Sequence, residues 1–140
     1  MSDRKLALIV KNQDPLILGT HDTVQHACRC MSERGVGAVL VTEPGGRLNG
    51  IFTGRDALRV LRDNMDAART TLASTMTPDP QTLTPDCTTI DALRRMRDGG
   101  FRHMPVVSQG TIIGIVSRGD FTGEEVEHLD YETHLWERIG

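Results

Sequence analysis

The segment at residues 50–56 reads Gly-Ile-Phe-Thr-Gly-Arg-Asp, and the segment at residues 114–120 reads Gly-Ile-Val-Ser-Arg-Gly-Asp. In both segments an apolar run leads to a hydroxyl residue, and an aspartate follows three positions later. This order predicts a strand that ends at the hydroxyl residue and a helix that begins there, because the hydroxyl and the acid together form a helix capping box. Two copies of such a segment in one chain indicate an internal repeat.

The repeat extends over most of the chain. Identical residues recur at an offset of 65, and after one additional residue in the turn at residues 43–48 the offset becomes 64. The matching pairs include Asp14 with Asp79, Pro15 with Pro80, Leu18 with Leu83, Thr23 with Thr88, Met31 with Met96 and Gly35 with Gly100. A duplicated architecture is therefore expected, and each copy can be interpreted with the help of the other.

Each copy predicts a short strand followed by a helix. Thr23 and Thr88 are the expected N-caps, since apolar residues at helical spacing follow both of them. Gly35 and the Gly99-Gly100 pair are expected to end these helices.

The rest of each copy predicts a β-hairpin and a second helix. Two apolar runs separated by turn residues occur at residues 38–52 and again at residues 104–116, as is typical of hairpins. The second helix is expected at residues 54–62 in the first copy and at residues 118–126 in the second. Each copy thus has the order β-α-β-β-α.

These patterns predict an α/β fold of two β-α-β-β-α repeats packed with pseudo-twofold symmetry, because one copy alone leaves a face of its sheet uncovered. We expect a first repeat at residues 6–65, a linker helix at 66–75, a second repeat at 76–123 and a C-terminal helical tail at 124–140. In the tail Leu135, Trp136 and Ile139 share one helical face, which covers either the chain's own core or another subunit.

Composition excludes several classes of protein. The 140 residues include 16 Lys and Arg against 19 Asp and Glu, and 4% are aromatic. This balance argues against binding to nucleic acid. The longest apolar runs are too short to span a bilayer, and no signal peptide is recognisable, so a cytoplasmic protein without membrane association is expected. Cys28, Cys30 and Cys87 form no CxxC pair and are expected to be free thiols.

The Thr53-to-Asp56 and Ser117-to-Asp120 segments allow two interpretations. They are either simple helix caps or binding sites for a sugar. A carboxylate on the first turn of a helix can accept hydrogen bonds from both hydroxyls of a ribose cis-diol, and the free N–H groups beside it favour an anion such as phosphate.

Taken together, these features resemble a tandem pair of CBS domains, the regulatory repeats named after cystathionine beta-synthase. The resemblance covers residues 6–123 and includes Phe-Arg-His-Met-Pro-Val-Val at residues 101–107. It implies a non-enzymatic regulatory module that binds AMP, ADP, ATP or NAD in clefts between the repeats, with no catalytic cofactor. It also implies a homodimer and an unidentified protein that the module regulates.

The resemblance further implies which residues bind the ligand. Asp56 with Thr53, and Asp120 with Ser117, would hold the two riboses. Contacts cross between repeats in this family, so residues 101 and 102 would complete the Asp56 cleft. The residues implied for phosphate and base are Arg55, Phe101, Arg102, His103, Arg118, Val36 and Gly37.

The two implied sites are not equivalent. Val36 and Gly37 would complete the Asp120 cleft, but Gly37-Ala38 in the first repeat stands where the second repeat has Arg102-His103. The first repeat therefore lacks a matching cationic pair. One strong site, or two sites of unequal affinity, is expected.

Two alternative functions remain open. The first is a ligand-free scaffold that docks another protein through the C-terminal helix. The second is a small hydrolase or metal-dependent enzyme that uses His26, Cys30 or His103. His26 and Cys30 share a helix face, but they align with Asp91 and Arg95, which are surface residue types, so no metal site is expected.

Overall fold

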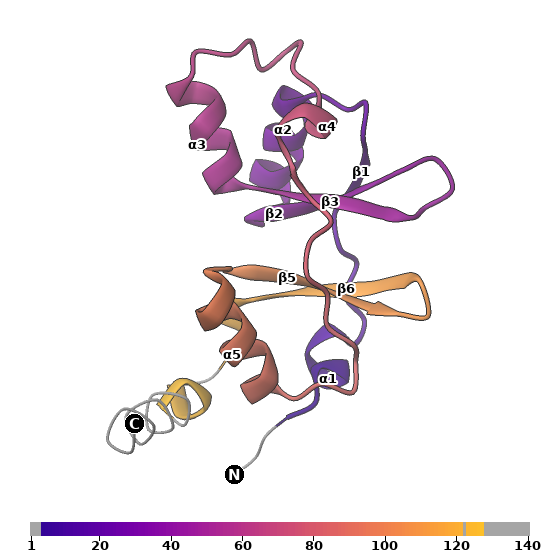
Figure 1. Ribbon diagram of the computed structural model, residues 1–140, viewed down its shortest axis with the longest axis vertical. Helices are drawn as coiled ribbons and strands as arrows, with labels where there is room; N and C mark the ends of the chain where they lie inside the picture. The colour runs from indigo at the N-terminus through magenta and orange to yellow at the C-terminus, as the bar shows by residue number, and fades with distance from the viewer. Residues whose placement is uncertain (1–3, 122, 128–140) are drawn as a thin grey trace. The chain divides into compact units, whose positions relative to one another are not determined.

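The computed structural model describes residues 4–121 and 123–127, which fold as two compact units (Figure 1). Residues 14–80 form what we call the first-repeat unit. Residues 4–13, together with the described residues from 81 onward, form the second-repeat unit. Each unit has its own cluster of buried apolar side chains. The mixed α/β architecture of two repeats agrees with the prediction.

The first-repeat unit contains a four-stranded sheet of order β1-β2-β3-β4. Strand β2 pairs with β1 in parallel, and β2 with β3 and β3 with β4 pair antiparallel. Figure 1 shows the three helices of this unit on the same side of the sheet. The elements are β1 (Ile17–Gly19), α2 (Val24–Arg34), β2 (Ala38–Thr42), β3 (Leu48–Thr53), α3 (Gly54–Arg62), α4 (Leu72–Thr75) and β4 (Thr77–Pro78).

The second-repeat unit contains the antiparallel hairpin of β5 and β6. Leu83 forms a parallel bridge to Val106 of β5, so it stands where β1 stands in the other unit. The elements are α1 (Leu6–Val10), α5 (Thr89–Gly99), β5 (His103–Ser108), β6 (Thr111–Ser117) and a 3-10 helix, η1 (Arg118–Asp120). Both predicted hairpins are therefore confirmed.

The predicted helix ends are confirmed as well. The Thr23 hydroxyl accepts a hydrogen bond from the His26 N–H at 3.1 Å, and Thr88 forms a capping box with Asp91. Gly35 and Gly100 adopt φ values of 66° and 71°, which glycine adopts more readily than other residues, and α2 and α5 end there.

The linker helix expected at residues 66–75 forms only as α4, from Leu72 to Thr75. The residues before it are non-helical because their carbonyl groups satisfy the first N–H groups of α2. The Val24 N–H donates to the Thr70 carbonyl at 2.9 Å, and the Gln25 N–H donates to the Ala67 carbonyl at 3.0 Å. If residues 66–75 formed one continuous helix, the carbonyl groups of Ala67 and Thr70 would accept hydrogen bonds within that helix and could not accept from α2.

The N-terminal segment repeats this arrangement in the second-repeat unit. The Thr89 N–H donates to the Arg4 carbonyl at 2.8 Å, as Val24 does to Thr70. Leu6 is completely buried in that unit's core, as Leu72 is in the other. The sequence predicted that residues 6–13 belong to the first repeat, but they fold with the second-repeat unit. Residues 71–80, which lead into the second repeat, fold in the corresponding way with the first-repeat unit.

The side chain of Gln13 completes the edge of β6. Its amide accepts from the Ile115 N–H at 2.7 Å and donates to the Ile115 carbonyl at 2.9 Å. In the first-repeat unit β4 pairs with Ile51, the matching position of β3. Both sheet edges are therefore covered by the segment that leads into the other repeat.

The helix predicted at residues 118–126 is wrong in its first half. Residues Arg118–Asp120 form the 3-10 helix η1, Phe121 is extended, and residues 123–127 are helical. Gly119 and Gly123 weaken a continuous helix, and the extended residue buries its ring in the core, where Phe121 is 9% exposed.

The sequence also predicted an apolar helix face in the C-terminal tail and the lack of a membrane-spanning segment. The apolar face predicted for Leu135, Trp136 and Ile139 lies outside the described residues. No helix in the described part of the chain is long and apolar enough to cross a membrane.

Candidate functional site

In the first-repeat unit the Thr53-to-Asp56 turn joins β3 to α3. The Thr53 N–H donates to Oδ2 of Asp56 at 2.9 Å, and the Thr53 hydroxyl donates to the same oxygen at 3.3 Å. The other oxygen, Oδ1, forms an ion pair with Arg59 at 3.2 Å. Asp56 is only 3% exposed, so both carboxylate oxygens are partnered and shielded from solvent.

In the second-repeat unit the Ser117-to-Asp120 turn has the same capping box, although it opens a 3-10 helix and not an α-helix. The Ser117 N–H donates to Oδ2 of Asp120 at 2.7 Å, and the Ser117 hydroxyl lies 3.3 Å from that oxygen. Asp120 is exposed, and no described residue donates a hydrogen bond to its Oδ1. This carboxylate therefore offers a free acceptor to a ligand, which Asp56 does not.

The ion pair of Asp56 with Arg59 was not anticipated from the sequence. An acid and an arginine three residues apart on a helix are close enough to pair, so the spacing alone could have indicated it. In the second repeat the position that matches Arg59 is Gly123. The glycine at this position has no side chain that could form an ion pair with Asp120, which is one reason why Asp56 has an arginine partner and Asp120 has none among the described residues.

Each hairpin brings the start of its first strand beside its own turn. The Gly54 N–H donates to the Gly37 carbonyl at 3.2 Å, and the Arg118 N–H donates to the Arg102 carbonyl at 2.9 Å. His103 pairs with Ser117 in the register of β5 and β6. Val36 and Gly37 therefore lie near the Asp56 turn of their own unit, and the expected crossing of contacts between repeats stays a prediction.

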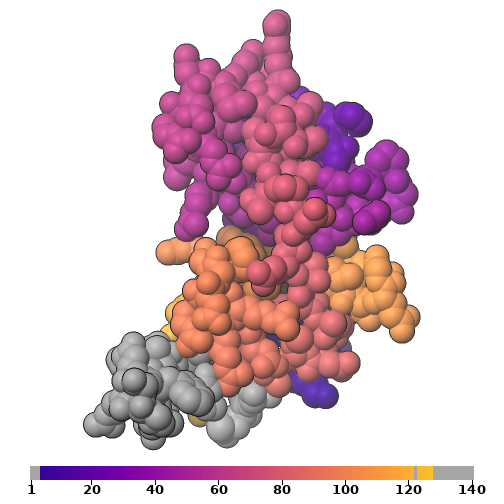
Figure 2. Space-filling model, in the orientation of Figure 1, coloured from indigo at the N-terminus to yellow at the C-terminus, as the bar shows by residue number. Residues whose placement is uncertain are grey.

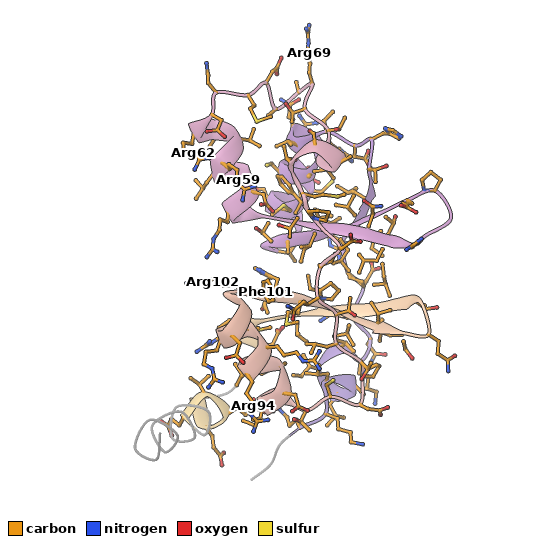
Figure 3. All side chains as sticks on the ribbon, viewed as in Figure 1. Arg59, Arg62, Arg69, Arg94, Phe101 and Arg102 are labelled. Carbon is orange, nitrogen blue, oxygen red and sulfur yellow. The ribbon has the colours of Figure 1, made fainter. Side chains whose placement is uncertain are left out.

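The candidate cations are unevenly distributed. Arg55 is exposed in the first-repeat unit, whereas Arg102 and Arg118 are exposed in the second-repeat unit beside the Asp120 turn. Figure 3 places Phe101 and Arg102 where α5 leads into β5. Phe101 is half-buried against the core of its unit. Of the two Thr/Ser-x-x-Asp turns, the Asp120 turn is the one that combines an exposed carboxylate with two exposed guanidinium groups.

Arg4 is a further contact of the Asp120 turn that the sequence did not indicate. Its guanidinium donates to the backbone carbonyl of Asp120 at 3.1 Å and pairs with Glu125 at 2.8 Å. Glu125 is 5% exposed. The N-terminal segment therefore fastens the end of this turn to the helical residues that follow it.

His103 is half-buried, and burial lowers its pKa from the ordinary value of 6.5. Asp120 opposes this shift and Arg102 adds to it. Because the pKa of His103 is lower in the folded state, the unfolded chain binds this proton more tightly than the folded chain does. Protonation of His103 as the pH falls below about 6.5 therefore favours unfolding. Burial therefore favours the neutral form of His103 in the folded chain, and its expected contact with phosphate stays a prediction.

We expect this group to make the fold less stable in acid. As pH falls from about 7.5 to about 5.5, protonation of His103 should lower the free energy of unfolding. In the His103→Gln variant, which has no imidazole at this position, the free energy of unfolding should fall less over the same pH range. Urea unfolding at a series of pH values measures it. An unchanged slope in His103→Gln would refute the assignment.

The described residues contain no group of three or more His, Cys, Asp or Glu side chains arranged to hold a metal ion. The three cysteines are free thiols in the structure. The Asp120 turn presents a carboxylate, a hydroxyl and exposed guanidinium groups, all of which can form hydrogen bonds to a polar ligand.

Known proteins share both the sequence pattern and the fold. The CBS domain model matches residues 9–63 and 72–127. The chain is 38% identical over 114 residues to the meiotically up-regulated gene 70 protein of Schizosaccharomyces pombe, covering 80% of this chain and 16% of that protein. It is 31% identical over 109 residues to the CBS domain-containing protein YhcV of Bacillus subtilis, covering 77% of this chain and 76% of YhcV.

Among solved structures, the chain is similar to the CBS domain protein PAE2072 from Pyrobaculum aerophilum, complexed with AMP. The TM-score is 0.81 with 21% identity, covering 91% of this chain and 98% of that one, which supports the fold. The chain spans less than a fifth of the length of the first curated relatives it matches. With two matched segments and the duplicated architecture described above, the chain belongs to the CBS domain family as a tandem pair of CBS domains.

Proposed function

We propose that this CBS pair is a non-enzymatic regulatory module that binds an adenosine nucleotide, with its stronger site at Asp120. The observation that carries the proposal is the exposed Asp120 carboxylate, whose Oδ1 receives no hydrogen bond from a described residue while Ser117 holds Oδ2. A cis-diol needs two acceptor positions in a fixed geometry, and this carboxylate provides them.

The surroundings of Asp120 suit the remainder of a nucleotide. Arg102 and Arg118 are exposed and joined through their backbones beside the turn, so they supply positive charge for phosphate. The Asp56 turn is expected to bind more weakly, because Arg59 already pairs with Oδ1 of Asp56 and this side chain is only 3% exposed. AMP complexed with the similar Pyrobaculum protein supports an adenosine ligand. ADP, ATP and NAD share the same adenosine moiety.

Thermal unfolding with a nucleotide panel tests the proposal. A ligand that binds only the folded state stabilises it by about 2.7 kcal/mol at one hundred times its Kd, so AMP, ADP, ATP or NAD should raise the Tm. The sharper comparison is AMP with 2′-deoxy-AMP, which lacks one hydroxyl of the diol. Calorimetry should show roughly tenfold weaker binding of the deoxy compound. Equal affinity would refute the diol assignment.

The scaffold alternative makes the opposite prediction. If the chain only docks another protein through its C-terminal helix, no nucleotide should change the Tm. The apolar face expected for that docking, Leu135, Trp136 and Ile139, lies outside the described residues, so this alternative stays a prediction, as does a regulated partner protein.

The homodimer implied by the family is also part of the proposal. Helix α3 lies at the surface (Figure 2) and exposes Leu58 and Leu61, which are 66% and 75% exposed. An apolar surface of this kind is suited to a second copy of the chain. A cytoplasmic location stays a prediction from the sequence.

A further inference from the structure

His26 and Cys30 lie one turn apart on the solvent-facing side of α2. Nε2 of His26 is 3.6 Å from Sγ of Cys30, the His26 side chain is exposed and Cys30 is half-buried. The opposite side of α2 faces the core through Val24, Ala27 and Met31. The pair is therefore held by a rigid helix and remains accessible from solvent.

The separation of these two atoms matches the requirement of a metal ion. Zinc binds imidazole nitrogen at about 2.0–2.1 Å and thiolate sulfur at about 2.3 Å, and a tetrahedral angle between the two bonds places the donor atoms roughly 3.5–3.6 Å apart. The observed distance falls at the upper end of that interval. Both side chains can thus bind one ion with little movement of either.

The chemistry of the pair selects the class of ion. Imidazole and thiolate are donors for borderline and soft cations such as Zn²⁺ and Cd²⁺, whereas Mg²⁺ and Ca²⁺ prefer oxygen. On binding, the Cys30 thiol releases its proton to solvent and the sulfur donates an electron pair to the metal, while His26 donates the lone pair of Nε2 with its proton on Nδ1. No redox change is involved.

The other cysteines are less suitable. Cys28 packs against the core, and burial raises the pKa of its thiol, so it forms the thiolate less readily than an unburied cysteine. Cys87 contacts the Thr84 hydroxyl at 3.4 Å. The absence of a third ligand among the described residues leaves the remaining coordination positions to water or to another molecule.

We propose that His26 and Cys30 form a two-ligand surface site for a divalent cation of the zinc class. The site is independent of the nucleotide proposal, because neither side chain belongs to the Asp56 or Asp120 turn. With two protein ligands, it exchanges its ion more readily than a four-ligand structural site.

Titration of the reduced chain with Cd²⁺ tests the site, followed by the ultraviolet thiolate-to-metal charge-transfer absorption. The wild-type chain should show the band and saturate at one ion, and His26→Ala and Cys30→Ser should each weaken binding by about tenfold or more. His21→Ala and Cys87→Ser are the matched controls and should bind as the wild type does. Thermal unfolding without metal verifies that every variant is folded.

Zn²⁺ provides the second measurement. It should raise the Tm of the wild-type chain but not of His26→Ala, a chelator should reverse the rise, and Mg²⁺ should have no effect. The proposal is overturned if no charge-transfer band forms. It is equally overturned if His26→Ala binds Cd²⁺ as tightly as the wild type, since Cys30 would then act alone.

Discussion

Replacement of Asp120 by alanine is expected to weaken AMP binding by at least roughly a hundredfold, because it removes two hydrogen bonds to a charged group at about 1.5–3 kcal/mol each. The fold should change little, since Asp120 is exposed and η1 is a single turn. Calorimetry with AMP and thermal unfolding of the ligand-free variant measure the two effects separately.

Asp56→Ala is the matched comparison and should behave in the opposite way. It removes a buried carboxylate that accepts from the Thr53 N–H and pairs with the partly exposed Arg59, so it should lower the Tm while reducing AMP affinity less than Asp120→Ala does. If the two variants exchange these effects, the Asp56 turn is the stronger site. If Asp120→Ala binds AMP normally, the carboxylate only caps the turn.

Leu6→Ala is expected to destabilise the second-repeat unit by about 2–5 kcal/mol, the usual loss for a buried leucine. Leu6 is completely buried in that unit's core, although it precedes the first repeat in the chain. Hydrogen exchange should therefore increase in peptides from β5 and β6 and not in peptides from β2 and β3.

Leu8 provides the control on the same helix. It is 64% exposed, so Leu8→Ala should change the free energy of unfolding by no more than about 0.5 kcal/mol. Faster exchange in β2 and β3 after Leu6→Ala, or no change in either unit, would contradict the assignment of the N-terminal segment to the second-repeat unit.

Local structure was predictable because its causes lie within a few residues of each other. Thr23 and Thr88 cap their helices through N–H groups three residues away, and Gly35 and Gly100 end them through their own backbone freedom. The hairpins follow from alternating apolar runs and turns. Since every such feature occurs twice, the duplication and the family could be inferred from the sequence.

The sequence did not indicate that residues 4–13 fold with the second repeat and residues 71–80 with the first, although the two segments share a short sequence match. Leu6-Ala7 and Leu72-Ala73 coincide at an offset of 66, one residue away from the main register of the repeat. A two-residue match does not show which repeat each segment joins. The hydrogen bonds from Thr89 to Arg4 and from Val24 to Thr70 decide this.

For this chain, residues close together in the sequence were sufficient to predict the duplicated repeat, both hairpins, the helix caps and the pair of Thr/Ser-x-x-Asp turns. Long-range packing was needed to show that Asp56 is buried while Asp120 is exposed, and that each leading segment folds with the repeat that it does not lead into. Caps and turns depend on neighbours along the chain. Burial and edge pairing depend on residues far apart in sequence, whose packing must outweigh the entropy of closing long loops.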